Sequence, residues 1–293
     1  MAELQLPKPL VSAEWLLAAL AQRNPRLEHP TDPDLRIVDV RFSLADPLAG
    51  YMAYREGHIP GAVYLNLETD LSAPLQPDRK GGRHPLPTPE AFARTLSQAG
   101  IGNEHWVVVY DDNGMVAPRL WWMLRWLGHD AVAVLDGGFK AYVEAGGRLE
   151  AGVSPYPPAT FTPHPRPEMV LDAASVANRP AGTILIDSRA PERYRGEVEP
   201  LDPVAGHIPG AINRDWTDSL GPDGRFKPAE VQRERFAGAE GKDLIVYCGS
   251  GVSATANLLA LEVAGIKNAK LYAGSWSDWV SDPRRPVVKG GQP

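Results

Sequence analysis

A repeated block of sequence constrains the fold of this 293-residue chain more than any other feature. Residues 57–62 read Gly-His-Ile-Pro-Gly-Ala, and residues 206–211 repeat them 149 positions later. Three further landmarks recur in the same order: an apolar segment ending near aspartate and arginine (37–41, 184–189), one ending in tyrosine (107–110, 244–247), and a glycine-aromatic turn (135–139, 271–276). Four landmarks in one order predict two homologous domains in tandem rather than a solenoid of short repeats.

Short apolar segments alternate with helical ones in both halves, as in the helical patterns at 88–99 and 119–128. This alternation predicts an α/β fold in which each domain is a mainly parallel sheet flanked by helices. We place the two domains at 1–150 and 169–293. Between them, residues 151–168 contain six prolines, which predicts a semi-rigid linker.

Composition and charge limit the classes of function. With 43% hydrophobic and 23% charged residues, the chain has the make-up of globular domains. Its net charge of -6 gives no support for a nucleic-acid partner, which usually requires a basic surface. We expect no signal peptide, because residues 1–20 lack a basic region followed by a continuous apolar core. We expect no membrane span, because no apolar run approaches about 18 residues. The single cysteine excludes an internal disulfide, and these features together predict a cytoplasmic protein.

The single cysteine, Cys248, lies between a predicted buried strand at 244–247 and a predicted helix at 254–264. Gly249 and Gly251 let backbone N–H groups converge in this turn, and the positive end of the following helix dipole points at the sulfur. Such a turn favours the thiolate and predicts a nucleophile. The alternative is a buried structural cysteine, which requires no glycine-rich loop.

The first half carries an aspartate, Asp111, at the position equivalent to Cys248, within the sequence Tyr-Asp-Asp-Asn-Gly at 110–114. A carboxylate cannot perform the chemistry of a nucleophilic sulfur. We therefore predict that the first domain is inactive and has a structural, pocket-forming role.

The chain resembles the tandem-domain rhodanese-like sulfurtransferases over about residues 11–279. Three motifs carry the resemblance: Asp-x-Arg and Gly-His-Ile-Pro-Gly-Ala in both halves, and a cysteine loop in the second half alone. The resemblance implies a rhodanese fold in each half and no cofactor. It also implies that Cys248 takes sulfane sulfur from a small-molecule donor as a persulfide. The acceptor would be cyanide, a small thiol or a thioredoxin-like protein.

The loop residues 248–252, Cys-Gly-Ser-Gly-Val, resemble those of the 3-mercaptopyruvate sulfurtransferase subgroup. Thiosulfate-preferring members commonly carry basic side chains there, and this loop has none. We expect Ser250 to relay or donate a proton to the departing enolate. Backbone amides of the loop would hold the transferred sulfur. The loop residues assigned to this binding role are Gly249, Gly251, Val252 and Ser253.

Arg193 falls where the resemblance places an arginine that binds the donor carboxylate, a group that a guanidinium can hold with two hydrogen bonds. The alternative is a surface-loop arginine paired with Glu192 or Glu197. Relatives often carry a second arginine further on, where this chain has Leu201 and Asp202.

Because that second arginine is missing, a thiosulfate:cyanide sulfurtransferase stays an alternative. Arg83 or Arg119 is a candidate replacement. Arg83 and His84 also lie in a loop, 81–87, that resembles one closing over the cleft in relatives.

Four further residues have competing interpretations. The resemblance implies that a first-domain histidine relays protons with the loop serine, which makes a relay role the alternative for His58. Its repetition as His207 favours a shared structural role instead. Arg189 is interpreted as tying loops together, with a catalytic role as the alternative. Trp276 is expected to line the pocket, with core packing as its alternative.

Three alternative functions fit the sequence less well. Cysteine-dependent phosphatases need an arginine six residues after the cysteine, where this chain has Ala254. A metal site is not predicted, because one cysteine and scattered histidines lack zinc-site spacing. A non-catalytic rhodanese-like binding module fits the Asp111 half and leaves the Cys248 loop unexplained.

Overall fold

The computed structural model describes residues 6–22, 35–153 and 155–292. Its contacts divide the chain into two compact units. The first comprises Met1–Leu71, Pro87–Pro165 and Pro222–Arg225, and the second comprises Ser72–Leu86, Arg166–Gly221 and Phe226–Pro293. Within the described residues, no helix is both long and apolar enough to cross a membrane.

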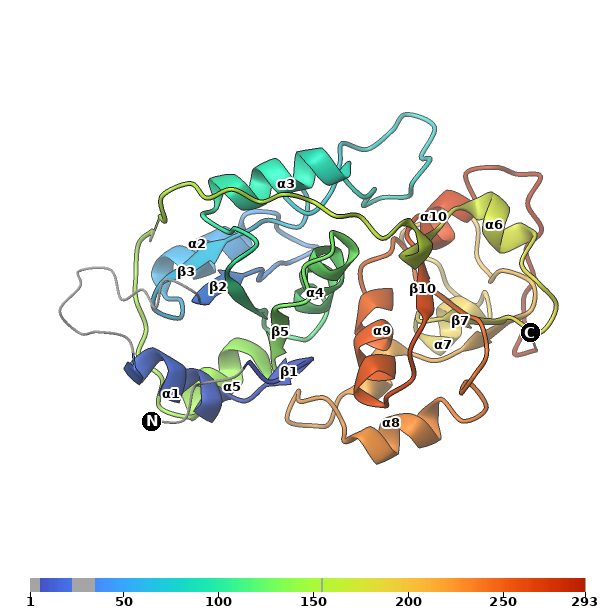
Figure 1. The fold of residues 1–293 in the computed structure, drawn as a ribbon. Coiled ribbons are helices and arrows are strands. Elements are labelled where there is room, and N and C mark those ends of the chain that lie inside the picture. Colours follow the sequence, from blue (N-terminus) through green and yellow to red (C-terminus); the bar gives the residue numbers. More distant parts are fainter. Residues whose placement is uncertain (1–5, 23–34, 154, 293) are drawn as a thin grey trace. The chain divides into compact units, whose positions relative to one another are not determined.

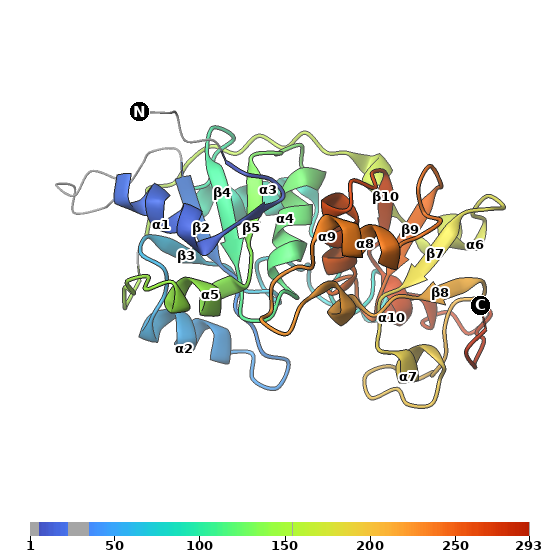
Figure 2. The same ribbon diagram turned by 90° about the horizontal axis from the view of Figure 1, so that it is seen from below.

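The first unit is built on a five-stranded parallel sheet with the order β1-β5-β4-β2-β3. Figures 1 and 2 show α3 and α4 on one face of this sheet and α1 and α5 on the other. Its strands are β1 (Leu10–Val11), β2 (Leu35–Asp39), β3 (Ala62–Tyr64), β4 (Trp106–Tyr110) and β5 (Val132–Leu135). Its helices are α1 (Ala13–Gln22), α2 (Ala49–Glu56), α3 (Pro89–Gln98), α4 (Ala117–Trp126) and α5 (Gly138–Glu144).

The second unit repeats this topology in a parallel sheet with the order β6-β10-β9-β7-β8. Its strands are β6 (Val170–Leu171), β7 (Ile184–Asp187), β8 (Ala211–Asn213), β9 (Leu244–Tyr247) and β10 (Ala269–Tyr272). Its helices are α6 (Ala173–Ala177), α7 (Pro191–Tyr194), α8 (Ala229–Arg235), α9 (Ala254–Val263) and α10 (Ser275–Trp279), with short 3-10 turns at Pro167–Met169 and Trp216–Ser219. The identical strand order confirms the predicted pair of α/β domains.

The recurring landmarks meet in space within each unit. The Tyr110 hydroxyl accepts the Ile59 N–H at 3.2 Å and donates to Asp39 at 2.7 Å. In the second unit the Tyr247 hydroxyl accepts the Ile208 N–H at 3.2 Å. Burial, reinforced by the nearby aspartate, raises the pKa of both tyrosines well above the ordinary value, so each stays a neutral hydroxyl. The spaced motifs are therefore parts of one polar cluster that fixes the strand ends.

Two loops depart from the bounds drawn from the sequence. Ser72–Leu86, between β3 and α3, belongs by its contacts to the second unit, and Pro222–Arg225, before α8, belongs to the first. The fit of the longer loop depends on Gly82, because a Cβ there would lie 2.3 Å from the Gly274 carbonyl oxygen. As a result, Arg83 and His84 lie in the second unit.

Candidate active site

The cysteine loop runs from the end of β9 to the start of α9. Cys248 is 1% exposed, and its Sγ accepts the Gly251 N–H at 3.2 Å. Gly251 has a φ of +77°, and a Cβ on it would lie 2.2 Å from the Ala273 carbonyl oxygen, so the turn requires glycine. The Cys248 N–H donates to Ser275 Oγ at 3.1 Å and its carbonyl accepts the Trp276 N–H at 3.0 Å. Backbone hydrogen bonds therefore fix the position of Cys248 and leave its side chain out of these contacts.

The equivalent turn of the first unit holds an acidic side chain. The buried Asp111 carboxylate accepts four backbone N–H groups, those of Asn113, Gly114, Val116 and Ala117, at 2.7–3.2 Å. Burial raises the pKa of Asp111, and these four hydrogen bonds oppose that rise. Gly114 has a φ of +76°, close to the +77° of Gly251. The turn is therefore a cradle for an anion, filled in the first unit by the chain's own carboxylate.

In the second unit the equivalent turn follows Cys248, whose Sγ accepts one of its N–H groups, that of Gly251. The amides that correspond to the Asp111 donors belong to Ser250, Gly251, Ser253 and Ala254. Among the described residues, those of Ser250, Ser253 and Ala254 have no protein acceptor. These donors, together with the positive end of α9, suit a thiolate or the terminal sulfur of a persulfide.

The contacts of Asp111 predict how an aspartate at position 248 would change the thermal stability of the protein. We expect Cys248→Asp to be inactive and yet to have a higher Tm than Cys248→Ser, because its carboxylate can accept the open amides as Asp111 does. A hydrogen bond to a charged group contributes about 1.5–3 kcal/mol. Thermal unfolding of both variants measures the difference, and an equal or lower Tm for the aspartate variant would show that the cradle does not bind anions.

His84 reaches the loop serine from the Ser72–Leu86 segment. Its Nδ1 lies 2.8 Å from Ser250 Oγ, and both side chains are buried. A histidine and a serine at this distance can pass a proton between them. Ser250 lies two residues after Cys248, so the pair is close to the nucleophile along the loop.

His58 has its partners within the first unit. Its Nδ1 lies 2.7 Å from the Tyr54 carbonyl oxygen, and its ring stacks on Tyr54 with the centroids 4.1 Å apart. His207 makes the same pair of contacts with Tyr194, at 2.8 Å and 3.8 Å. This shared geometry favours the structural interpretation of both histidines and leaves His84 as the relay candidate.

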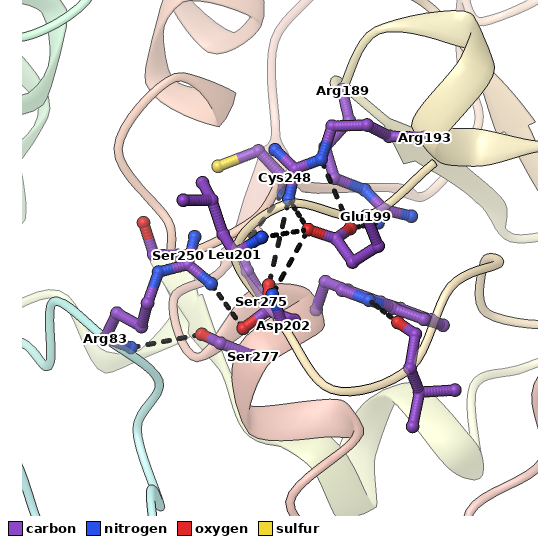
Figure 3. A network of polar contacts seen from close by, with 12 residues as sticks. Arg83, Arg189, Arg193, Glu199, Leu201, Asp202, Cys248, Ser250, Ser275 and Ser277 are labelled. Atoms are coloured by element: carbon purple, nitrogen blue, oxygen red, sulfur yellow. Dashed lines mark hydrogen bonds and ion pairs between the residues drawn. The ribbon is translucent and has the colours of Figure 1, made fainter. Parts of the chain in front are cut away.

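Two guanidinium groups converge on the residue after the nucleophile. A Cβ built on Gly249 would lie 2.9 Å from Nη2 of Arg83 and 3.4 Å from Nη2 of Arg193. Figure 3 shows both arginines extending towards the loop that carries Cys248. Glycine at position 249 therefore leaves room for two cations beside the nucleophile.

Buried carboxylates orient these cations. Arg83 pairs with Asp202, as Figure 3 shows, and Nη2 of Arg193 lies 3.7 Å from the other oxygen of Asp202. Arg193 also pairs with Glu199 at 2.6 Å. Among the described residues, neither Nη2 of Arg83 nor Nη1 of Arg193 has a protein acceptor. Each arginine therefore keeps a donor for an anionic ligand.

The structure also separates the alternatives for Arg193. Its partners are Glu199 and Asp202 rather than Glu192 or Glu197; Glu197 pairs instead with Arg195 at 2.7 Å. Its side chain is 17% exposed, unlike a surface-loop arginine. This placement favours the substrate-binding interpretation.

Two further candidates, Arg119 and Arg189, make structural contacts. Arg119 is buried and its Nη2 donates to the Leu71 carbonyl in the first unit at 3.0 Å. Arg189 donates to Asp187 at 2.5 Å and to the Gly206 carbonyl at 2.6 Å. Burial by itself would lower the pKa of Arg189, but Asp187 raises it above the usual value. Arg189 thus ties loops together.

Trp276 belongs to the hydrophobic core of the second unit and is fully buried. Its face lies 4.5 Å from the Arg189 guanidinium, and its Nε1 donates to the Val204 carbonyl at 2.9 Å. These contacts favour core packing over a pocket wall. No cluster of three or more histidine, cysteine or acidic side chains suited to a metal occurs within the described ranges.

Comparison with known proteins places this site in a family. The Rhodanese family model, described as a rhodanese-like domain, matches residues 12–145 and 172–282. The chain belongs to the rhodanese-like domain family, with two copies in tandem.

Relatives with this arrangement are sulfurtransferases. The chain is 49% identical to the probable 3-mercaptopyruvate sulfurtransferase of Pseudomonas aeruginosa, over 96% of this chain and 98% of that one. It is 43% identical to SseB of Mycobacterium tuberculosis, a putative thiosulfate sulfurtransferase, over 88% and 92%. The crystal structure of SseA from Escherichia coli, a 3-mercaptopyruvate sulfotransferase by its description, matches with a TM-score of 0.78 and 34% identity, over 92% of this chain and all of that one.

Proposed function

We propose that this protein is a sulfurtransferase that moves sulfane sulfur from 3-mercaptopyruvate, through a persulfide on Cys248, to a thiol or cyanide. The observation that carries the proposal is the convergence of three kinds of group on one loop. These are an anion cradle around Cys248, a proton-relay pair in His84 and Ser250, and two guanidiniums over Gly249. The relatives of Pseudomonas aeruginosa and Escherichia coli support the same activity.

The first half-reaction forms the persulfide. The Cys248 thiolate attacks the sulfur of the donor, a sulfur–sulfur bond forms, and the carbon–sulfur bond breaks. The electron pair of that bond leaves as the enolate of pyruvate. Ser250, backed by His84, is placed to supply the proton that converts this enolate into pyruvate. The cradle amides hold the outer sulfur meanwhile.

The second half-reaction discharges the persulfide. A thiolate or cyanide attacks the outer sulfur, the sulfur–sulfur bond breaks, and Cys248 leaves as the thiolate. The acceptors that suit this chemistry are cyanide, a small thiol and a thioredoxin-like dithiol protein. We propose the second domain, 169–293, as the catalytic one, in a protein of the cytoplasm. The first domain, 1–150, is inactive in the sense that it has no nucleophile of its own, and its Ser72–Leu86 loop contributes Arg83 and His84 to the catalytic unit.

Arg83 and Arg193 are the proposed binding groups for the donor carboxylate. Arg83 would take the role of the second arginine that relatives often carry and that this chain lacks at Leu201. A dianionic donor such as thiosulfate also favours two cations, and the relative from Mycobacterium tuberculosis carries that name. The test compares kcat/KM for 3-mercaptopyruvate and thiosulfate with the same acceptor. We expect preference for 3-mercaptopyruvate, and a reversed ratio would support the thiosulfate alternative.

Removal of either binding arginine should weaken use of the donor. We expect Arg193→Ala and Arg83→Gln each to lower kcat/KM for 3-mercaptopyruvate by on the order of 10- to 100-fold, the loss expected for one charge-assisted contact. Arg195→Gln is the matched control, because Arg195 is a more exposed neighbour that pairs with Glu197. Steady-state kinetics measure all three, and an unchanged value for Arg193→Ala would return Arg193 to the surface-loop interpretation.

A further inference from the structure

Two chain segments that are distant in sequence build the site in the second unit, and Ser277 in α10 touches both. Its backbone N–H donates to the Gly249 carbonyl at 2.9 Å, which holds the cysteine loop. Its side-chain Oγ accepts the Arg83 N–H at 3.0 Å, a contact drawn in Figure 3. No other role in the mechanism above requires this serine.

Neighbouring contacts extend the same junction. The Gly81 N–H donates to Asp278 Oδ1 at 3.0 Å. A Cβ on Gly82 would lie 2.7 Å from Ser277 Oγ, so the chain passes too close for any side chain. Residues 81 to 83 therefore pack against α10 and against Gly274, which precedes it. The next residue is His84, and the contacts of residues 81 to 83 with α10 set its distance to Ser250.

The first unit provides an internal comparison. The Phe139 N–H donates to the Asp111 carbonyl at 2.9 Å, as the Trp276 N–H does to that of Cys248 at 3.0 Å. This equivalence aligns Lys140 with Ser277, and Lys140 is an exposed side chain 3.7 Å from Glu144. The unit without the nucleophile thus has no serine at this position.

We propose that Ser277 is a positioning residue that sets the register between the Arg83–His84 segment and the cysteine loop. Its N–H fixes the loop and its hydroxyl fixes the segment, so one residue aligns the cations and the proton relay with the sulfur. This inference rests on the proposed sulfur-donor site. Ser277→Ala removes the contact to Arg83 and keeps the contact to Gly249, which separates the two roles.

The test uses the single cysteine as a reporter and needs no sulfur donor. Iodoacetate carries a carboxylate and iodoacetamide does not. The rate at which iodoacetate alkylates Cys248, divided by the rate for iodoacetamide, therefore reports how well the two arginines are positioned beside the sulfur. We expect Ser277→Ala to lower this ratio by about 3- to 10-fold, the effect of losing one hydrogen bond, with the iodoacetamide rate unchanged. Arg83→Gln should lower the ratio as well.

Ser281→Ala is the matched control, because the Ser281 hydroxyl donates to the nearby Asp278 carbonyl at 2.8 Å, and this variant should leave the ratio unchanged. If Ser277→Ala does not fold, Ser277→Gly also removes the hydroxyl and adds no second cysteine to the reporter assay. An unchanged ratio, or an equal fall in both rates, would overturn the proposal. A wild-type protein that reacts with the alkylating agents but not with 3-mercaptopyruvate would refute the proposed donor and leave this test intact.

With the donor, a second readout distinguishes positioning from general damage. If Ser277 acts through His84, Ser277→Ala should slow kcat in the wild-type background and add little in a His84→Gln background, because both changes disable one relay. Fully additive losses would contradict the coupling to His84.

Discussion

Cys248→Ser abolishes sulfur transfer from 3-mercaptopyruvate and from thiosulfate, with an expected loss in kcat of at least about 10³-fold. The reason is chemical, since the chain has no other cysteine to form a persulfide. The serine variant should keep the fold, because the contacts of position 248 with Ser275 and Trp276 use the backbone. Pyruvate release measures the loss, and circular dichroism provides the control for folding. Substantial residual transfer would show that sulfur does not pass through Cys248.

The second large effect is expected at the proton relay. His84→Gln and Ser250→Ala should each reduce kcat with 3-mercaptopyruvate by on the order of 10²-fold, the lower end of the usual contribution of general acid catalysis. The double variant should be about as slow as either single one, because the two side chains act as a unit through their 2.8 Å contact.

A matched control for the relay comes from the first unit. His58→Gln removes a histidine whose ring stacks on Tyr54 and whose Nδ1 bonds the Tyr54 carbonyl, so it should lower the Tm and spare kcat. Stopped-flow measurement of pyruvate release distinguishes the variants. A normal kcat for His84→Gln, or a slow one for stable His58→Gln, would reverse the assignment of the relay.

Much of the fold follows from local sequence. The repeat, the apolar strands and the helical segments predict two α/β domains, and the helix expected at 88–99 is α3, which Thr88 caps by accepting the Ala91 N–H at 3.2 Å. Sequence comparison also aligns Asp111 with Cys248. It does not reveal that four amides surround the Asp111 carboxylate, because that depends on the φ of +76° at Gly114 and the path of the chain after it.

The position of His84 could not be read from spacing. The contact between Arg83 and Ser277 joins residues 194 positions apart, and that between His84 and Ser250 joins residues 166 positions apart. Both depend on a close passage of backbone at Gly82, which no periodic pattern encodes. Repetition of His58 as His207 favours a shared structural role, which agrees with their matching contacts to the Tyr54 and Tyr194 carbonyls. The glycine pair before Arg83 was the available signal.

The missing second arginine shows a similar limit. The sequence identifies Leu201 as a departure and leaves Arg83 and Arg119 as equal replacements. Tertiary structure separates them, because Arg83 reaches the space over Gly249 whereas Arg119 donates to the Leu71 carbonyl. We therefore propose Arg83, rather than Arg119, as the second binding cation.

The most direct test of the central claim is the mass of Cys248 after incubation with 3-mercaptopyruvate and no acceptor. We predict that intact-protein and peptide mass spectrometry will find one added sulfur atom on Cys248, released when cyanide or a thiol is supplied. The absence of the adduct with both 3-mercaptopyruvate and thiosulfate would contradict the assignment of Cys248 as a persulfide carrier.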